Sequence, residues 1–405
     1  MAKQTSNLTK TIVNQPNFNG FGPSILIPQT RGRIRRNELP SDRLEGRKLL
    51  REKCPKTPGV YGWLNRDGQL TYVGKSKCLQ LRLLSYYAKT PTEKKMERIR
   101  TQSKYLIWEP ISDELLALLR EQELIFRWTP EFNAQGQPNR RLPAFLCVSK
   151  SSAPNLFSTT RLTPRVSEAY GPIPGTGRLS EAATCVNYLF KLRDCPEKTP
   201  FEFSNQLQLF HEPPRAKCIR HELGSCPAPC AGCCTQTQYS DGLKNTMDFL
   251  EGRDRTIVKQ VEKEMQLAAT QMRFEQAAVL RDRFKTIRWL DRQLQRLRDT
   301  KSRLNGVIPI EARRNRIVWL VLRGGRLIDN MLEPSDLAQA RLTSETLQKL
   351  AAQSSDTPSD RLDVKLQLII SAWFRKQKDW YDRVIPFEEI IQRCEKFGRS
   401  HAFCA

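Results

Sequence analysis

The sequence lacks long apolar runs, and it has far fewer acidic than basic residues and only three histidines. None of its apolar stretches approaches the roughly 20 residues that a helix needs to cross a bilayer, so we expect no membrane partner. The beginning of the chain is polar and has no apolar segment of the secretory type, which predicts a cytoplasmic protein. No long internal repeat is present.

The charge of the chain is strongly one-sided. Lys and Arg total 67 against 43 Asp and Glu, which gives a formal net charge of +24. Such an excess favours a polyanionic partner, because binding releases condensed counterions. No basic amphipathic segment with a large apolar face stands out, so we expect nucleic acid rather than an anionic membrane. The 405 residues are enough for roughly two to four domains.

Residues 1–45 are predicted to form a poorly ordered basic arm. The segment is rich in Asn, Gln, Pro and Thr and carries a basic run near its end. Arg33, Arg35 and Arg36 of this run are candidate contacts to DNA phosphates. The alternative is a solvated tail.

Two tyrosines fall on the paired strands of a predicted β-hairpin. Residues 59–64 and 70–74 have the composition of strands, and Asp67-Gly68 between them is typical of a tight turn. Tyr61 lies on the first strand and Tyr72 on the second. Taken alone, each would be interpreted as an ordinary half-buried strand residue.

Three charged residues downstream suggest phosphodiester cleavage. Glu121, on a helix predicted over 114–128, offers a hard oxygen ligand for Mg²⁺. Arg82 can stabilise charge on phosphoryl oxygens. A tyrosine can take a proton from water only if a cation or metal lowers its pKa, and Lys75 close to Tyr72 is a candidate for that cation.

These residues fall within sequence blocks that resemble the GIY-YIG nuclease domain of the UvrC family of repair excinuclease subunits. The blocks cover residues 57–61, 72–86, 119–125 and 129–133, and the resemblance extends over about 54–146. It implies one divalent metal, Mg²⁺ or Mn²⁺, on Glu121, and Lys77 is a further candidate contact to DNA. The implied active-site residues are Tyr61, Tyr72, Lys75, Arg82, Glu121 and the supporting Asn133.

Two other glutamates compete with Glu121 for the metal. Glu123 lies two positions further on, so it points roughly 200° away around the helix. The family's spacing of twelve residues before Asn133 favours Glu121. Glu114 is a weaker candidate, interpreted as a solvated acid of the first helical turn. Which of the two tyrosines acts as the base stays open.

Seven of the twelve cysteines lie between Cys185 and Cys234, in a segment that is partly rich in proline. Their spacing fits neither a zinc ribbon nor a ferredoxin run, so spacing alone leaves zinc and iron–sulfur open. The segment resembles the cysteine segment of the UvrC family, which implies a [4Fe-4S] cluster. Scattered free thiols are the alternative, and Cys233 and Cys234 compete for the fourth position. The implied ligands are Cys195, Cys218, Cys226 and Cys230.

Two helices are predicted at about 240–270 and 274–298, with apolar residues at helical spacing. Residues 274–282 resemble the UVR motif, a helical hairpin that pairs with a like hairpin. The resemblance implies a UvrB-like partner that contacts about 256–289, whereas the simpler interpretation is an intramolecular core. The candidate partner contacts are Phe274, Ala277, Ala278 and Arg281.

The predicted fold class is α+β, with a small GIY-YIG sheet flanked by helices as its first globular part. A basic arm (1–45) precedes the nuclease domain (46–150), and a cysteine-rich iron–sulfur segment (151–240) and a UVR hairpin (241–298) follow. The last part (299–405) is predicted to be a small α/β region, interpreted as a truncated remnant of the family's RNase H-like domain.

The sequence therefore predicts a structure-specific endonuclease of nucleotide excision repair that acts on damaged double-stranded DNA. We expect a single metal-dependent incision, 3′ of the lesion, because only one nuclease site is recognisable. The main alternative is a non-catalytic scaffold that binds DNA and a UvrB-like protein. A mobile-element nuclease is disfavoured by the cysteine and UVR segments.

Overall fold

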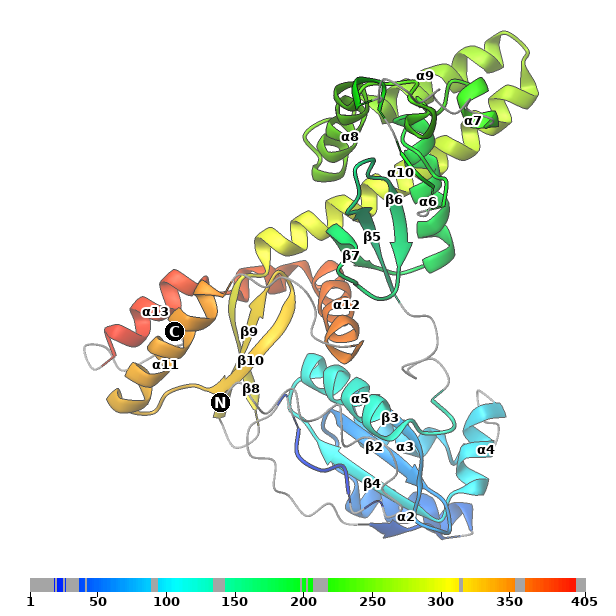
Figure 1. Cartoon of the computed structure of the whole chain (residues 1–405). Coiled ribbons are helices and arrows are strands. Elements are labelled where there is room, and N and C mark those ends of the chain that lie inside the picture. The colour runs from blue at the N-terminus through cyan, green and yellow to red at the C-terminus, as the bar shows by residue number, and fades with distance from the viewer. Residues whose placement is uncertain are drawn as a thin grey trace. The chain divides into compact units, whose positions relative to one another are not determined.

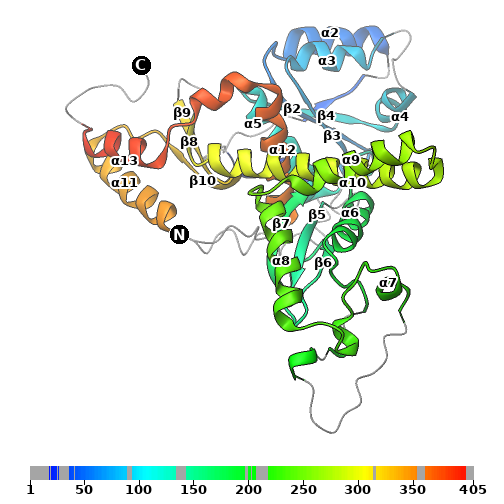
Figure 2. The same ribbon diagram turned by 90° about the horizontal axis from the view of Figure 1, so that it is seen from above.

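The computed structural model describes Phe18, residues 20–24, Leu26 and residues 36–40, 42–88, 94–133, 143–196, 199–201, 203–206, 218–312, 316–353 and 361–397. The chain divides into two compact units, drawn in Figures 1 and 2. Unit 1 combines residues 1–140 with 301–405, and unit 2 comprises residues 141–300. In the described part every strand pairing is antiparallel, and helices pack on small sheets. The expected α+β class is confirmed.

The predicted hairpin lies inside a four-stranded sheet of unit 1 with the order β1-β4-β2-β3. β2 (Gly59–Leu64) and β3 (Leu70–Ser76) join β1 (Asn37–Glu38) and β4 (Tyr105–Pro110). The register pairs Tyr61 with Gly74 and Trp63 with Tyr72. Paired residues share a face of a sheet, so Tyr61 and Tyr72 lie on the same side, with ring centroids 6.2 Å apart.

Helices cover both faces of this sheet. α5 (Glu114–Trp128) packs on one face, and α2 (Arg43–Lys53), α3 (Leu79–Ser85) and α4 (Lys94–Gln102) pack on the face that carries the two tyrosines. The Asp113 side chain accepts a hydrogen bond from the Leu116 N–H, which caps α5. This cap explains why α5 begins where the sequence predicted.

Part of the N-terminal segment packs into the core of unit 1. Phe18, Phe21 and Leu26 are buried. Phe21 lies against Gly62 of β2, where a Cβ atom would come within 3.0 Å of the ring. The expectation of a poorly ordered arm does not hold for these residues, because burying three large apolar side chains offsets the entropy of ordering a short segment.

The C-terminal region shares the core of the nuclease fold. Its antiparallel sheet, ordered β10-β9-β8, comprises β8 (Gly306–Ala312), β9 (Arg316–Arg323) and β10 (Arg326–Leu332). α11 (Leu337–Ala352) and α13 (Phe387–Glu395) pack together, and η3 (Lys378–Arg383) precedes α13. α12 (Arg361–Lys376) packs on α5, as Figure 1 shows, and its Phe374 lies in the same core as Leu115.

Unit 2 begins with a three-stranded sheet in the order β6-β5-β7, with β5 (Ala144–Ser149), β6 (Leu156–Thr159), β7 (Val166–Ile173) and α6 (Thr176–Leu189) packed on it. The remaining elements are η1 (Ser204–Gln206), α7 (Ile219–Glu222), η2 (Pro229–Ala231), α8 (Gln236–Glu251), α9 (Thr256–Thr270) and α10 (Phe274–Arg303).

The first of the two helices predicted for unit 2 is in fact two helices. α8 ends at Glu251 and is capped by Gly252, whose φ of 77° is left-handed and favours glycine, and α9 begins at Thr256. The periodicity of the apolar residues did not reveal this break. Within the described part of the chain, no helix is both long and apolar enough to cross a membrane.

Candidate functional site

Three tyrosines and an arginine meet on the face of the sheet that α3 covers. The hydroxyl oxygens of Tyr61 and Tyr86 lie 3.0 Å apart, and Arg82 Nε donates to the Tyr61 hydroxyl at 3.3 Å. A Cβ atom at Gly74 would come within 2.5 Å of the Tyr61 hydroxyl oxygen. Glycine at position 74 therefore gives Tyr61 the space to lie against β3.

Burial governs the protonation of these phenols. It raises the pKa of Tyr61, Tyr72 and Tyr86, and the Arg82 guanidinium opposes the rise only in part. All three hydroxyl groups are therefore neutral hydrogen-bonding groups at neutral pH. Tyr61 is almost fully buried, whereas Tyr72 retains partial exposure. Of the two tyrosines that the sequence singled out, Tyr72 is the more accessible to a water molecule.

Glu121 reaches this site from α5. Its Oε1 accepts a hydrogen bond of 3.0 Å from the Lys75 N–H at the end of β3. Burial raises the pKa of the Glu121 carboxyl to about 7, while Lys75 and Arg82 oppose the rise. Because ionisation of a buried carboxyl costs free energy, a nearby divalent cation would stabilise the ionised form of Glu121 strongly.

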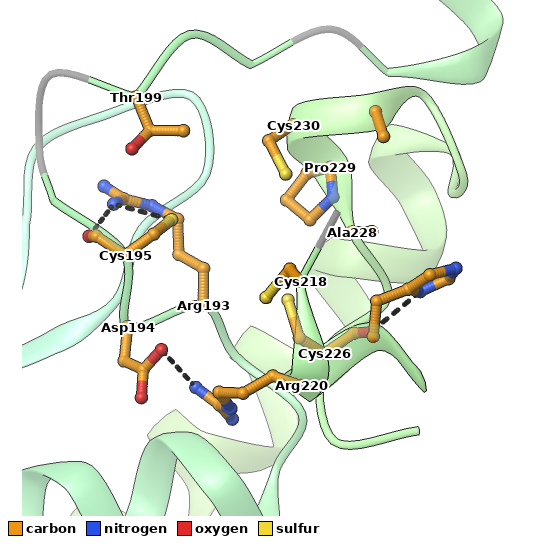
Figure 3. A pocket seen from close by; sticks show the side chains of 12 residues that line it. Arg193, Asp194, Cys195, Thr199, Cys218, Arg220, Cys226, Ala228, Pro229 and Cys230 are labelled. Atoms are coloured by element: carbon orange, nitrogen blue, oxygen red, sulfur yellow. Dashed lines mark hydrogen bonds and ion pairs between the residues drawn. The ribbon is translucent and has the colours of Figure 1, made fainter. Parts of the chain in front are cut away.

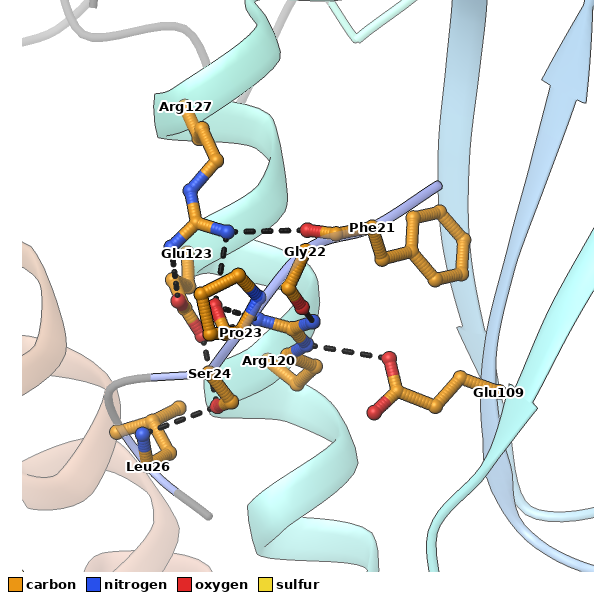
Figure 4. A network of polar contacts seen from close by, with 9 residues as sticks. All are labelled: Phe21, Gly22, Pro23, Ser24, Leu26, Glu109, Arg120, Glu123 and Arg127. Atoms are coloured by element: carbon orange, nitrogen blue, oxygen red, sulfur yellow. Dashed lines mark hydrogen bonds and ion pairs between the residues drawn. The ribbon is translucent and has the colours of Figure 1, made fainter. Parts of the chain in front are cut away.

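Glu123, one rival for the metal, is held in an ionic network, shown in Figure 4. Its carboxylate pairs with Arg120 and Arg127, each at 2.8 Å, and accepts from the Ser24 hydroxyl at 3.0 Å. Arg120 also pairs with Glu109 at 3.3 Å and is fully buried. The network thus joins α5 to β4 through Arg120 and to the N-terminal segment through the Ser24 contact of Glu123.

The second rival, Glu114, holds two lysines. Its carboxylate oxygens lie 3.1 Å from Lys75 Nζ and 2.8 Å from Lys77 Nζ. These cations lower the pKa of Glu114 although its partial burial opposes them. Lys75 and Lys77, both predicted site residues, therefore direct their ammonium groups to the first turn of α5.

The cation expected beside Tyr72 is not Lys75. Tyr72 and Lys75 are three residues apart on an extended strand, so their side chains point to opposite faces. The structure places Lys95 of α4 there instead, with its Nζ 5.1 Å from the centroid of the Tyr72 ring. Sequence reasoning missed this residue because the contact joins elements that are distant in the sequence.

Asn133 supports the outer strand of the sheet. Its Oδ1 accepts from the Val73 N–H at 2.8 Å, and its Nδ2 donates to the Val73 carbonyl at 2.7 Å. The neighbouring Phe132 N–H donates to the Thr71 carbonyl at 2.9 Å. Asn133 thereby supplies β3, which carries Tyr72 and Gly74, with hydrogen bonds that a further strand would otherwise make.

The four predicted cluster cysteines line one cavity in unit 2, shown in Figure 3. Its volume is about 300 Å³, and neither Cys233 nor Cys234 contributes to its wall. Within the described residues, no three His, Cys, Asp or Glu side chains are placed to hold a single metal ion. The lining thiols are Cys195, Cys218, Cys226 and Cys230.

Two arginines fix the backbone around this cavity. Arg193 is buried, and its guanidinium donates to the carbonyls of Ala153 at 2.6 Å and Cys195 at 3.1 Å. Arg220 pairs with Asp194 at 2.8 Å and donates to the Ser225 carbonyl at 2.7 Å. His221 also lines the cavity, with Nδ1 3.4 Å from the Cys226 carbonyl oxygen. Both guanidinium groups bring positive charge close to the thiols.

Comparison with known proteins identifies two families in the chain. The UvrC-like GIY-YIG domain matches residues 57–134, and the UvrB/UvrC motif matches residues 255–288. The UvrABC system protein C of Carboxydothermus hydrogenoformans is 31% identical over 283 residues, which cover 68% of this chain and 44% of that protein. The chain belongs to the UvrC family.

Other relatives agree with this assignment. The UvrABC system protein C of Leptospira biflexa is 30% identical over 286 residues, which cover 69% of this chain and 45% of that protein. The chain thus spans less than half the length of these UvrC relatives. Among solved structures, the N-terminal endonuclease domain of Thermotoga maritima UvrC, described as bound to magnesium, is 34% identical over 22% of this chain and 94% of that one, with a TM-score of 0.20.

The UVR motif of this UvrC-family chain forms a hairpin of α9 and α10. Phe274 is 69% exposed at the start of α10, and Ala277 and Ala278 are half-buried. Arg281 is exposed and lies 3.2 Å from Asp282. Leu280 and Phe284 are buried. The hairpin thus combines an internal core with exposed apolar residues near its turn, and the latter are Leu267, Met272, Phe274 and Val279.

Besides Lys95, sequence reasoning missed Tyr86 in the nuclease site of this UvrC-family chain. Tyr86 lies one helical turn after Arg82, and the i, i+4 spacing on a short helix was a usable indication that both side chains face the same way. Of the candidate DNA contacts in the arm, Arg33 and Arg35 lie outside the described residues. Arg36 donates to the Phe18 carbonyl and so anchors the N-terminal segment.

Proposed function

We propose that this chain is a metal-dependent DNA endonuclease of nucleotide excision repair that makes a single incision 3′ of a lesion. The observation that carries the proposal is the convergence of Tyr61, Tyr72, Arg82 and Glu121 at one sheet edge. These residues come from two strands and two helices. A carboxylate, a guanidinium and phenols around one point suit hydrolysis of a phosphodiester.

Each side chain has a distinct role in the proposed reaction, an in-line attack of water on the phosphorus. Tyr72 is the more accessible phenol, and only its phenolate form can receive the proton of the attacking water. Burial opposes that form by raising the pKa of Tyr72, and the Arg82 guanidinium favours it. Tyr61, fixed by Tyr86 and Arg82, orients the site. The Arg82 guanidinium stabilises the charge that builds up on the phosphoryl oxygens and on the leaving oxygen.

Glu121 is the residue proposed to hold the divalent cation, Mg²⁺ or Mn²⁺. Its partly buried carboxyl group, with one oxygen on a backbone N–H, fits a hard cation that keeps water and phosphate oxygens as its other ligands. When bound, the cation lowers the pKa of a water molecule and polarises the phosphoryl group. Glu114 and Glu123 are less suited, since lysines and arginines already neutralise them.

The cysteine cavity is proposed to hold a [4Fe-4S] cluster through Cys195, Cys218, Cys226 and Cys230. Four thiols that line a cavity of about 300 Å³ fit a group larger than a single ion. Arg193 and Arg220 offset the negative charge that such a ligand set carries. We assign the cluster a structural role, which is to join loops that are distant in the sequence.

A UvrB-like protein is the proposed partner, recruited through the α9–α10 hairpin. The exposed Phe274 and its apolar neighbours support this assignment, because a solvent-exposed patch of this kind gains free energy when a second hairpin covers it. Damaged double-stranded DNA is the proposed substrate, in agreement with the net charge of +24.

Incision of an end-labelled, lesion-containing duplex tests the proposal, with Mg²⁺ and a UvrB-like protein present. We expect one nick on the 3′ side for the wild type and its loss in Glu121→Gln. DNA binding retained without a nick from either protein would favour the alternative, a non-catalytic scaffold. An equal nick from both proteins would remove Glu121 from the mechanism.

A further inference from the structure

Helix α4 carries cations beside the nuclease site that the proposed mechanism does not use. Its basic residues are Lys94, Lys95, Arg98 and Arg100, against one acid, Glu97. Met96 and Ile99 are buried in the same core as Tyr61 and so fix the helix on the sheet. The position of its exposed cations is therefore set by packing, although these side chains themselves are in solvent.

Lys95 and Arg98 lie over two aromatic rings that flank the site. Lys95 Nζ is 5.1 Å from the centroid of Tyr72, and the Arg98 guanidinium carbon is 5.2 Å from that of Phe132. Both distances are within the range of a cation–π contact, about 6 Å. A ring face leaves the hydrogen-bond donors of the cation available to an anion on its other side.

Their ionic surroundings distinguish Lys95 from the other lysines of the site. Lys75 and Lys77 are both held by Glu114. Arg98 lies 4.0 Å from Glu131, and both side chains are largely exposed, so this pair is weak. Among the described residues, no carboxylate lies within ion-pair distance of Lys95. An exposed cation in this position has its full charge available for a ligand.

We propose that Lys95, assisted by Arg98, binds backbone phosphates of the DNA strand that enters the nuclease site. This inference deepens the proposed function, on which it rests. A phosphate on Lys95 lies beside the ring of Tyr72, so Lys95 sets the position of the strand relative to the proposed proton acceptor. The contact is to the backbone and carries no base specificity.

The salt dependence of DNA binding tests the proposal without any incision. An end-labelled duplex is titrated with the full-length protein in EDTA at several salt concentrations. We expect Lys95→Met to weaken binding about three- to tenfold and to reduce the slope of log K against log salt by about one, as the loss of one phosphate contact predicts. Lys95→Arg, which keeps the charge, should stay close to wild type.

Lys94→Met is the matched control, because Lys94 precedes Lys95 on the same helix and points about 100° away. The slope of log K against log salt should change less in Lys94→Met than in Lys95→Met. An unchanged slope in Lys95→Met would overturn the proposal, and so would equal changes in both variants, since only net charge would then matter. Incision by the wild type is measured in the same preparation, because it tests the nuclease proposal alone. A failure of the Lys95 proposal can then be told apart from a failure of the nuclease proposal.

A second measurement avoids substitutions altogether. Amine acetylation of the wild type, followed by mass spectrometry, reports which lysines DNA covers. We expect DNA to protect Lys95 several-fold and to leave Lys104 reactive, since Lys104 pairs with Glu38 of β1, at the opposite edge of the sheet from β3, which carries Tyr72. Equal reactivity of Lys95 with and without DNA would contradict the proposal.

Discussion

The nuclease site and the cysteine cavity hold their functional side chains in different ways. In the nuclease site the side chains contact one another: the hydroxyl groups of Tyr61 and Tyr86 share a hydrogen bond, and Arg82 donates another to Tyr61. Around the cysteine cavity the contacts come from Arg193 and Arg220 and go mostly to backbone carbonyls, while the thiols face the cavity. The contacts of the first site join its functional side chains to one another, whereas those of the second mainly fix the backbone that carries the thiols.

Removal of one cavity cysteine should have the largest effect. We expect Cys226→Ala to abolish iron binding after anaerobic reconstitution with iron and sulfide, because a four-thiolate cluster loses a ligand. Cys234→Ala, outside the cavity, should retain iron. Iron content and visible absorbance report the result. Two results would contradict this difference between the sites: Cys226→Ala keeps its iron, or it loses Mg²⁺ binding at Glu121.

Arg82→Ala should lower the incision rate by about 10²- to 10³-fold, since a positioned cation is lost from the developing charge. Single-turnover kinetics on a nicked-product assay measure this loss. Arg51→Ala, an exposed arginine on α2, serves as the control and should change the rate less than about twofold. A similar loss in both variants would show that general charge, not the contact of Arg82 with Tyr61, sets the rate.

Glu123→Gln tests whether Glu123 stabilises the fold, in contrast to Glu121, which is proposed to bind the metal. We expect the free energy of unfolding to fall by about 2–3 kcal/mol, because buried Arg120 loses a charged partner. Urea denaturation measures the change. Mg²⁺ affinity of the folded protein should remain. Loss of Mg²⁺ binding with normal stability would assign the metal to Glu123.

The pH dependence of Mg²⁺ binding should show the smallest effect. Because the pKa of Glu121 is raised to about 7, its carboxyl is protonated below that pH, and Mg²⁺ must displace the proton. Affinity should rise about fivefold between pH 6 and pH 7, reach about tenfold by pH 8 and level off above that, as calorimetric titration can follow. In the absence of metal, protonated Glu121 contributes to the free energy of unfolding, because its pKa is higher in the folded state. This contribution is fully present below about pH 4.5 and is lost as the pH rises through about 7.

Much of the nuclease site could be predicted because its information is local in the sequence. The Asp67-Gly68 turn sets the register that brings Tyr61 and Tyr72 to one face, and Asp113 sets the start of the helix that carries Glu121. Family resemblance then supplied roles for the residues. The four cysteines that line the cavity in unit 2 were likewise singled out by the family resemblance, whereas their spacing alone left the kind of site open.

What could not be predicted depends on contacts between distant segments. Lys95 replaces Lys75 at the ring of Tyr72 because strand alternation turns Lys75 away, and nothing local in α4 indicates its neighbour. Phe21 is buried because Gly62 leaves space for its ring, a match that composition does not reveal. The packing of α12 on α5 joins residues separated by more than 200 positions.

This last separation has a consequence for synthesis on the ribosome. α5 leaves the ribosome long before α12, because the whole of unit 2 is translated between them. At about 5–20 residues per second, the apolar face of α5 waits on the order of ten seconds to a minute for its covering helix. We therefore expect the nascent chain to attract chaperones at α5, and the nuclease site to become rigid only after α12 has been translated.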